Sequence, residues 1–242
     1  MHQASEGILS TSKSDVSAGR RRDDEVRRPA AVLWDMDGTL IDSEPIWIAQ
    51  QFALVEHHGG TWSHRQGLEL VGSDMHETAD AMRAAGVVLD ATSIIATLEA
   101  GVIEALAQDV PWRPGVLDLL CDVRSSGIPA AIVTTSAHEM ADLVARSAPE
   151  GTFTCIVGSQ DVRRSKPHPD PYLEAARLLD VSIADCVAIE DSPNGLASAV
   201  ASGAVAIAVP NDAHLPTPGS WHVWPTLQGR TVADVEGLMR GR

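Results

Sequence analysis

The stretch Ala31-Val32-Leu33-Trp34-Asp35-Met36-Asp37-Gly38-Thr39 decides the fold. Its first four residues are a short apolar run, which is typical of a parallel strand buried on both faces. The run passes directly into Asp35 and Asp37. Because residues two apart in an extended segment face the same side, we expect both carboxylates to point into one site. Taken alone, two aspartates before a glycine would more often form a turn that ends the strand.

Four further apolar runs follow, and segments with helical spacing lie between them. The runs cover residues 129–133, 153–157, 186–189 and 204–209. Strands that alternate with helices predict an α/β fold with a Rossmann-like parallel sheet that is covered on both faces. In such sheets the chemistry lies outside the carboxyl ends of the strands. The predicted helical faces are Leu117, Leu120 and Val123; Met140, Leu143 and Val144; and Leu173, Ala176 and Leu179.

Residues 45–112 break this alternation, because they carry helical patterns and no convincing strand. Ile48, Phe52 and Val55 recur with helical spacing, and Asp90 is a candidate N-cap for a later helix. We interpret this segment as a helical cap domain inserted after the first strand.

The remaining chain then divides into a catalytic core of residues 30–44 and 113–242 and an N-terminal tail of residues 1–29. The tail is poor in apolar side chains, so we expect it to be disordered. It also lacks the apolar stretch of a secretory signal peptide.

The overall composition argues against several functional classes. No run approaches the roughly 18 consecutive apolar residues of a membrane span. The chain has 33 acidic and 18 basic side chains, and the formal charge of −15 disfavours nucleic acid and anionic membranes as partners. Its three cysteines lie far apart, without metal-like or disulfide-like spacing, so we expect a reduced, cytoplasmic protein.

Polar residues follow the apolar runs at the points where strands would end. Three hydroxyl residues, 134–136, follow the second run and precede a helical pattern. Such a group can bind an anion, although an ordinary helix cap is the more common meaning. Lys166 lies after the third run in KPHPDPY, and Glu190 and Asp191 end the fourth run in EDSPNG. Together these motifs place carboxylates, a hydroxyl and a lysine at one edge of the predicted sheet.

The order and spacing of these motifs resemble those of the haloacid dehalogenase-like (HAD) superfamily of aspartate-nucleophile phosphohydrolases. The resemblance covers about residues 31–239, and the cap is similar to that of the beta-phosphoglucomutase and phosphoglycolate phosphatase-like branch. It implies that Asp35 attacks phosphorus and forms an aspartyl-phosphate. It also implies that Asp37 protonates the leaving oxygen and then takes a proton from the hydrolytic water.

The same resemblance implies a Mg²⁺ cofactor. Its ligands would be the Asp35 side chain, the Asp37 backbone carbonyl and Asp191, with Glu190 binding directly or through water. Oxygen ligands of this kind are those that Mg²⁺ prefers. Lys166 would also hold Asp35 and neutralise the phosphate. The residues implied to bind the phosphate group of the substrate are Thr134, Thr135 and Lys166.

Three functions remain open at this point: a phosphatase, a phosphosugar mutase, and a non-catalytic phosphate-binding protein on the same scaffold. Asp37 favours phosphoryl transfer over dehalogenation, because a halide leaving group needs no proton. Similar mutases carry a histidine and an arginine in the cap, where this chain has Trp47 and Met75. Residues 45–110 hold two arginines against nine acidic residues, which suits a bisphosphate poorly. We therefore expect a monomeric phosphatase that hydrolyses a small-molecule phosphate monoester.

Overall fold

A computed structural model describes residues 28–70, 75–211, 215 and 219–239. Within these residues the strands form a six-stranded sheet in the order β3-β2-β1-β4-β5-β6, and each neighbouring pair is parallel. The predicted α/β fold with a Rossmann-like sheet is therefore confirmed. The expected disordered tail falls outside the described residues, apart from positions 28 and 29. The strands are β1 (Ala31–Trp34), β2 (Ala130–Val133), β3 (Cys155–Val157), β4 (Cys186–Glu190), β5 (Val205–Ala208) and β6 (His222–Val223).

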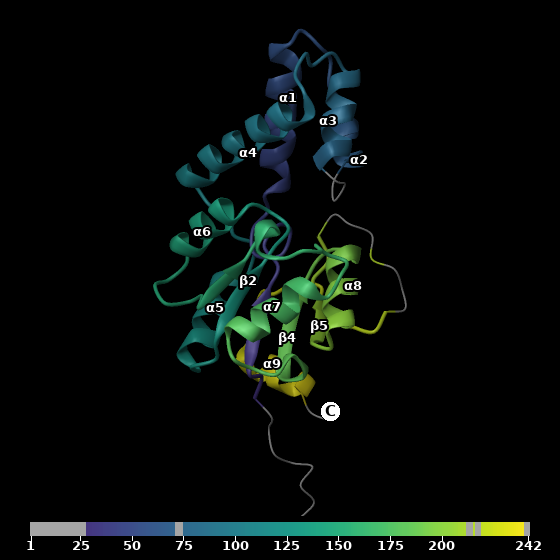
Figure 1. Ribbon diagram of the computed structural model, residues 1–242. Coiled ribbons are helices and arrows are strands. Elements are labelled where there is room, and N and C mark those ends of the chain that lie inside the picture. The colour runs from purple at the N-terminus through teal and green to yellow at the C-terminus, as the bar shows by residue number, and fades with distance from the viewer. Residues whose placement is uncertain (1–27, 71–74, 212–214, 216–218, 240–242) are drawn as a thin grey trace, which may run out of the picture.

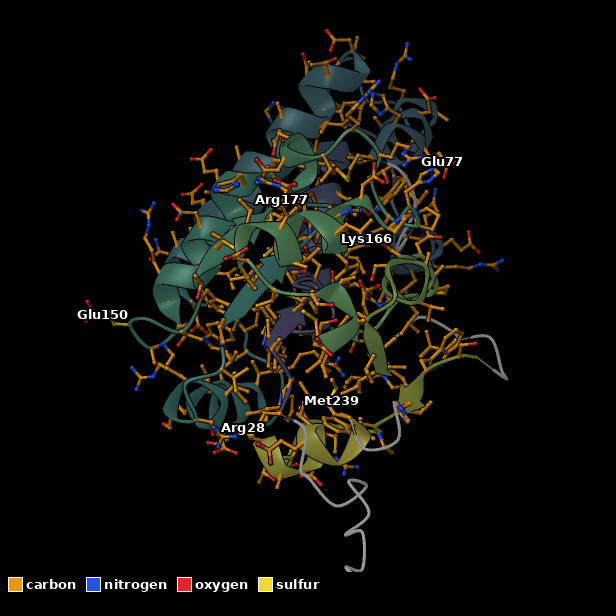
Figure 2. The ribbon with its side chains drawn as sticks, turned by 60° about the horizontal axis from the view of Figure 1, so that its bottom comes forward. Arg28, Glu77, Glu150, Lys166, Arg177 and Met239 are labelled. Atoms are coloured by element: carbon orange, nitrogen blue, oxygen red, sulfur yellow. The ribbon has the colours of Figure 1, made fainter. Side chains whose placement is uncertain are left out.

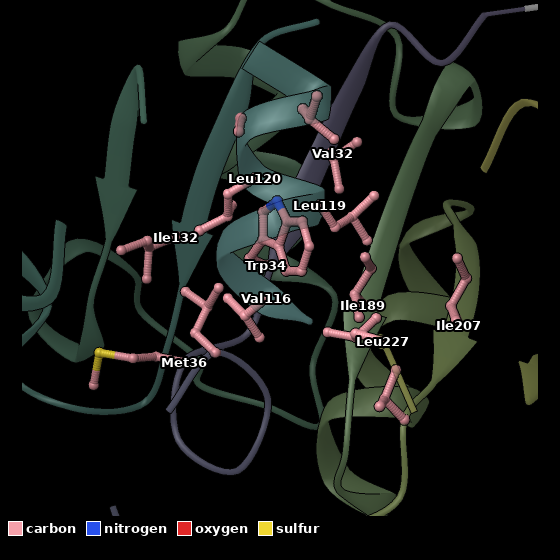
Figure 3. Close-up of a cluster of buried hydrophobic side chains, with 14 of the residues drawn as sticks. Val32, Trp34, Met36, Val116, Leu119, Leu120, Ile132, Ile189, Ile207 and Leu227 are labelled. Carbon is pink, nitrogen blue, oxygen red and sulfur yellow. The ribbon is translucent and has the colours of Figure 1, made fainter. Parts of the chain in front are cut away.

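Strand β1 is buried on both faces, as its uninterrupted apolar sequence requires. Val32 and Trp34 belong to one hydrophobic layer, and Ala31 and Leu33 belong to the layer on the opposite face. Figure 3 shows the Trp34 indole ring in the first of these layers, among side chains from the neighbouring strands and from helix α5 (Val116–Ser125). The two layers hold β1 at the centre of the sheet.

Helices cover both faces of the sheet (Figure 1). The layer around Trp34 also contains side chains from α5, α6 and α9, whereas the opposite layer is rich in alanine and contains side chains from α7 and α8. Small side chains let these last two helices approach the strands closely. None of the described helices is long and apolar enough to cross a membrane. The helices are α5 (Val116–Ser125), α6 (His138–Ser147), α7 (Asp170–Leu178), α8 (Pro193–Ser202) and α9 (Val232–Met239).

In the described residues between β1 and α5 there are four helices, and Figure 1 shows them together at one end of the molecule. Three of them, α1, α3 and α4, contribute to a separate hydrophobic cluster that includes Met82 and Leu98, together with Trp62 from the connection before α2. Asp90 caps the last of them as expected, because its carboxylate accepts a hydrogen bond from the Ser93 amide at 2.8 Å. The division of the chain into a core and a cap domain at residues 45–112 stays a prediction. The helices are α1 (Glu44–His57), α2 (His64–Glu69), α3 (Met75–Ala84) and α4 (Ala91–Gln108).

Two linkers connect these helices to the sheet, and they run side by side. Ile41 and Trp112 form an antiparallel bridge. The Asp42 amide donates to the Pro111 carbonyl at 2.9 Å. The chain therefore leaves and re-enters the sheet layer at neighbouring points.

Some predicted details are wrong. The spacing of the leucines placed Leu117 and Leu173 on buried helix faces, but their exposed fractions are 38% and 42%. In α7 the buried face instead includes Tyr172 and Ala175, each one residue before the predicted Leu173 and Ala176. Strand β6, whose two residues are exposed, was not predicted because two residues are too few to show a periodic pattern.

Candidate active site

The carboxyl ends of β1, β2 and β4 bring the predicted site residues together. The Asp35 amide donates to the Ile189 carbonyl at 3.0 Å, so the residue after β1 is fixed against β4. Thr134 follows β2, and its amide donates to the Val157 carbonyl of β3 at 2.9 Å. Lys166 lies within the outline of the molecule in Figure 2 and its side chain is 3% exposed, whereas Glu150 projects from the surface. The site is thus held by the backbone of the sheet itself.

Lys166 is the central cation of the site. Its Nζ donates to Asp35 Oδ1 at 2.6 Å, to Glu190 Oε1 at 2.6 Å and to the Val133 carbonyl at 2.8 Å. An ammonium has three N–H donors, so all three are used. Burial alone would lower the pKa of Lys166, but the charges of Asp35 and Glu190 raise it above its ordinary value. Lys166 therefore stays protonated and joins the two carboxylates.

The carboxylates outnumber this cation. Asp35, Glu190 and Asp191 are buried, and one oxygen from each lies within 4.8 Å of the others. Burial, followed by the charge of Glu190, raises the pKa of Asp35 to about 7. Burial, followed by the charges of Asp35 and Glu190, raises the pKa of Asp191 to about 9. Such crowding favours a bound cation, because an opposite charge stabilises the ionised forms.

The donor set is chemically suited to a hard divalent cation. Asp35 Oδ2 is buried and has no hydrogen-bond partner among the described residues, so it is available as a ligand. The cluster offers oxygen atoms alone, which suits Mg²⁺ or Ca²⁺ better than a soft metal. These residues therefore fit Mg²⁺, the metal that the family resemblance implies.

Glu190 has little capacity left for a metal. Its Oε1 accepts from Lys166 and, at 2.8 Å, from the Tyr172 hydroxyl. Its Oε2 accepts from the Ser192 hydroxyl at 3.1 Å and from the Asp191 amide at 3.2 Å. Burial and the charge of Glu190 raise the pKa of Tyr172 well above its ordinary value, so the phenol remains a donor. Glu190 is better placed as the counterion of Lys166 than as a direct ligand.

Two glycines make room for these carboxylates. A Cβ on Gly195 would lie 1.9 Å from the carboxylate atoms of Glu190. A Cβ on Gly38 would lie 2.0 Å from Asp191 Oδ2, and the positive φ of Gly38, +81°, also favours glycine. Any larger residue at either position would displace a carboxylate of the site.

Asp37 lies in a different set of contacts, formed by hydroxyl groups. Its Oδ1 accepts from Ser43 at 2.6 Å, and its Oδ2 accepts from Ser136 at 2.7 Å and from Thr134 at 3.4 Å. Met36 between the two aspartates is fully buried in the core, as the alternation of an extended segment predicts. Three hydroxyl donors thus hold Asp37 beside, rather than within, the cluster of Asp35, Glu190 and Asp191.

Sequence reasoning did not assign roles to several of these residues. Ser136 belongs to the hydroxyl run 134–136 and Ser43 follows the first motif, but a serine near a helix start has many ordinary meanings. Tyr172 ends the KPHPDPY stretch, in which the sequence assigned a role to Lys166 alone. Thr135, which was predicted to bind phosphate, has an exposed side chain next to Thr134.

The protein is thus a parallel α/β protein with a buried cluster of carboxylates and a lysine at the carboxyl edge of its sheet. A family model described as "Haloacid dehalogenase-like hydrolase" matches residues 32–209. The chain therefore belongs to the haloacid dehalogenase-like hydrolase family.

Curated relatives and solved structures agree with this family. Hexitol phosphatase A of Escherichia coli (strain K12) is 34% identical over 192 residues, which cover 76% of this chain and 84% of the relative. Beta-phosphoglucomutase of Bacillus subtilis (strain 168) is 27% identical, with coverage of 74% and 82%. The crystal structure of CbbY from Rhodobacter sphaeroides in complex with phosphate matches with a TM-score of 0.74 and 26% identity, covering 83% of this chain and 96% of that one.

Proposed function

We propose that this protein is a Mg²⁺-dependent phosphatase that hydrolyses a small-molecule phosphate monoester through an aspartyl-phosphate on Asp35. One observation carries the proposal: Asp35 is held by Lys166 at the end of β1, while Asp37 lies beside it among hydroxyl donors. A nucleophile and a separate acid/base are what two-step phosphate hydrolysis requires. The family membership and the relatives named as phosphatases support the same activity.

The two aspartates divide the chemistry between them. An Asp35 carboxylate oxygen attacks phosphorus, and the bond between phosphorus and the leaving oxygen breaks as Asp37 protonates that oxygen. Water then attacks the phosphorus of the aspartyl-phosphate, and Asp37 takes the proton that the water loses. Phosphate departs and Asp35 is regenerated. Because Ser43 and Ser136 donate to Asp37, they orient its carboxylate for both proton transfers.

Asp35 Oδ2, Asp191 and the Asp37 carbonyl would hold the Mg²⁺ ion. When bound, the ion supplies positive charge that reduces repulsion between the nucleophile and the phosphate. Lys166 adds a fixed positive charge at Asp35 Oδ1, and Glu190 holds that ammonium in place. Positioning and electrostatic stabilisation of this kind provide most of the catalysis in phosphoryl transfer.

The hydroxyl and amide groups after β2 would bind the phosphoryl oxygens. Thr134 is nearly buried at the strand end, and the Ser136 amide donates to its hydroxyl oxygen at 3.0 Å. We assign Thr134 to the transferring phosphoryl group, with Thr135 at the open side of the same loop.

Hydrolysis is favoured over mutase activity by the composition of α1–α4 and their connections. A mutase must grip a second phosphate, which calls for basic side chains, whereas residues 45–110 hold Arg65 and Arg83 against nine acidic residues. Both arginines are exposed and paired with acids on their own helices. Trp47 packs between the hydrophobic cluster of these helices and that of the sheet, so it offers no charge to a phosphate.

We also propose that the protein is a cytoplasmic monomer. Cys121, Cys155 and Cys186 are all free thiols, which supports a reducing compartment. The formal charge of −15 supports the proposal that nucleic acid and anionic membranes are not partners.

The activity is tested with Asp35→Asn and a screen of about a hundred metabolite monophosphates. We expect the wild type to release phosphate only with Mg²⁺, and the variant to lose at least about 10³-fold in turnover. Asp118→Asn, on an exposed position of α5, is the matched control and should keep full activity. Near-wild-type turnover by purified Asp35→Asn would refute the assignment of the nucleophile.

A further inference from the structure

Arg113 lies in the linker that returns from α4 to the sheet, and its guanidinium joins three backbone carbonyls. One nitrogen, Nη1, donates to the Gly38 carbonyl and, at 3.2 Å, to the Val209 carbonyl. The other, Nη2, donates to the Pro210 carbonyl at 3.0 Å. The planar guanidinium, with several donors in a fixed fork, suits this task, and a lysine does not. Arg113 thus ties the loop after β1 to the loop after β5.

The backbone of Arg113 reinforces this connection. Its amide donates to the Leu40 carbonyl at 3.0 Å, only two residues from Gly38. Within the loop, the Gly38 amide donates to the Ile41 carbonyl at 2.8 Å, and the Thr39 amide donates to the Met36 carbonyl at 3.2 Å. Both peptide groups that flank Gly38 are therefore fixed in orientation.

This orientation decides where two predicted metal ligands lie. The peptide group before Gly38 carries the Asp37 carbonyl. Among the described residues, no backbone amide donates a hydrogen bond to this carbonyl. The face of Gly38 itself lies against Asp191, since a Cβ there would lie 2.0 Å from Asp191 Oδ2. A rotation of the Gly38 peptides would change the direction of the Asp37 carbonyl and push the Asp191 carboxylate out of place.

Arg113 also acts on Asp191 through its charge. Burial is the largest cause of the raised pKa of Asp191. The positive charges of Lys166 and Arg113 act in the opposite direction and lower this pKa. Arg113 therefore lies close enough to influence the cluster of carboxylates, although its guanidinium bonds are made to backbone carbonyls.

We propose that Arg113 is a positioning residue for the metal site, which fixes the Gly38 peptides and through them the Asp37 carbonyl and the Asp191 carboxylate. The inference rests on the metal-dependent activity proposed above. Arg113 touches neither the nucleophile nor the substrate in this scheme. Its effect is on metal affinity, because groups that orient metal ligands typically change affinity by about 10- to 100-fold when they are removed.

The test uses the full chain and measures metal binding without any substrate. Wild type, Arg113→Met, Arg113→Lys and Arg124→Met are titrated with Mg²⁺ by calorimetry, and their melting temperatures are compared with and without Mg²⁺. Arg124 is the matched control, because its guanidinium also donates to a backbone carbonyl, that of Glu150 at 2.8 Å, on an exposed part of α5. Readouts of this kind separate metal binding from a general loss of stability.

We expect Arg113→Met to weaken Mg²⁺ binding by about 10-fold or more, with a correspondingly smaller rise in melting temperature on adding Mg²⁺. Arg113→Lys keeps the charge but not the three carbonyl contacts, so its affinity should fall between those of wild type and Arg113→Met. Arg124→Met should bind Mg²⁺ as the wild type does. At saturating Mg²⁺, the turnover of Arg113→Lys should approach that of the wild type.

Wild-type Mg²⁺ affinity in a folded Arg113→Met variant would overturn the inference and leave the proposed function intact. If that variant does not fold, Arg113→Lys decides in the same way, and an unchanged affinity overturns the inference. A wild type that binds no Mg²⁺ would instead refute the metal site of the proposed function, and the role of Arg113 with it.

Discussion

Replacing Asp191 with asparagine should make the metal-free protein more stable, although it removes a proposed ligand. Burial and the neighbouring charges of Asp35 and Glu190 raise the pKa of Asp191 from 3.8 to about 9. The folded protein thus binds this proton more tightly than the unfolded chain does. As the pH rises above about 4, Asp191 ionises in the unfolded chain but stays protonated in the folded protein until about pH 9. The free energy of unfolding therefore falls across this range.

The size of the effect follows from that difference. Each pH unit in this window lowers the free energy of unfolding by up to about 1.36 kcal/mol for one group. Between pH 5.5 and 7.5 the upper bound is therefore about 2.7 kcal/mol. Because Asp35 titrates in the same cluster and the structure relaxes around it, we expect about 1–2 kcal/mol in practice. Asparagine carries no such proton, so its advantage over the wild type should widen as the pH rises.

The assay is urea unfolding followed by tryptophan fluorescence at pH 5.5, 6.5 and 7.5, in the presence of a chelator. Glu150→Gln, on an exposed turn, serves as the control and should follow the wild-type pH dependence. Added Mg²⁺ should reverse the order of stability, because the wild type keeps its full set of ligands. An Asp191→Asn variant that is less stable at each pH, or whose advantage does not change with pH, would refute the electrostatic reasoning.

Three other substitutions test separate parts of the structure. Asp37→Asn should slow single-turnover cleavage of an alkyl phosphate by about 10²- to 10⁴-fold and that of nitrophenyl phosphate much less, because the second leaving group needs little protonation; equal losses would mean that Asp37 is not the acid. Gly195→Ala places a Cβ 1.9 Å from the Glu190 carboxylate, so the free energy of unfolding measured in urea should fall by about 1–3 kcal/mol. The control Gly237→Ala, whose Cβ would have no described atom within 4 Å outside its own helix, should be neutral or stabilising. Trp34→Phe removes a buried indole N–H that has no partner among the described residues. Removal of this unpaired donor should offset the lost ring volume, so the free energy of unfolding should stay within about 1.5 kcal/mol of the wild type. A loss above about 3 kcal/mol in the same assay would contradict this.

The strands and the main site residues could be predicted from the sequence because each depends on a local pattern. A buried parallel strand is a short apolar run, and a polar residue directly after it must lie at the sheet edge. Asp35, Thr134 and Glu190 therefore follow from position alone. Their roles in catalysis stay a prediction.

The supporting contacts could not be predicted, because they depend on segments that meet only in the folded chain. Tyr172 lies on the alanine-rich face of the sheet, and its hydroxyl reaches Glu190 across 18 positions of sequence. Ser136 reaches Asp37 across 99 positions. Nothing local to either residue distinguishes these bonds from an ordinary core tyrosine or a helix cap.

The paired linkers around α1–α4 have a consequence for protein engineering. Because Ile41 and Trp112 are bridged neighbours, the two ends of the intervening segment meet, and a short turn could join them without stretching the sheet. Closing a short loop between adjacent ends costs little conformational entropy. We therefore expect helices from a relative to be accepted at the same two points while β1, β2 and β4 keep their register, provided that the graft also replaces the contacts of Val102 and Leu106 with the sheet cluster.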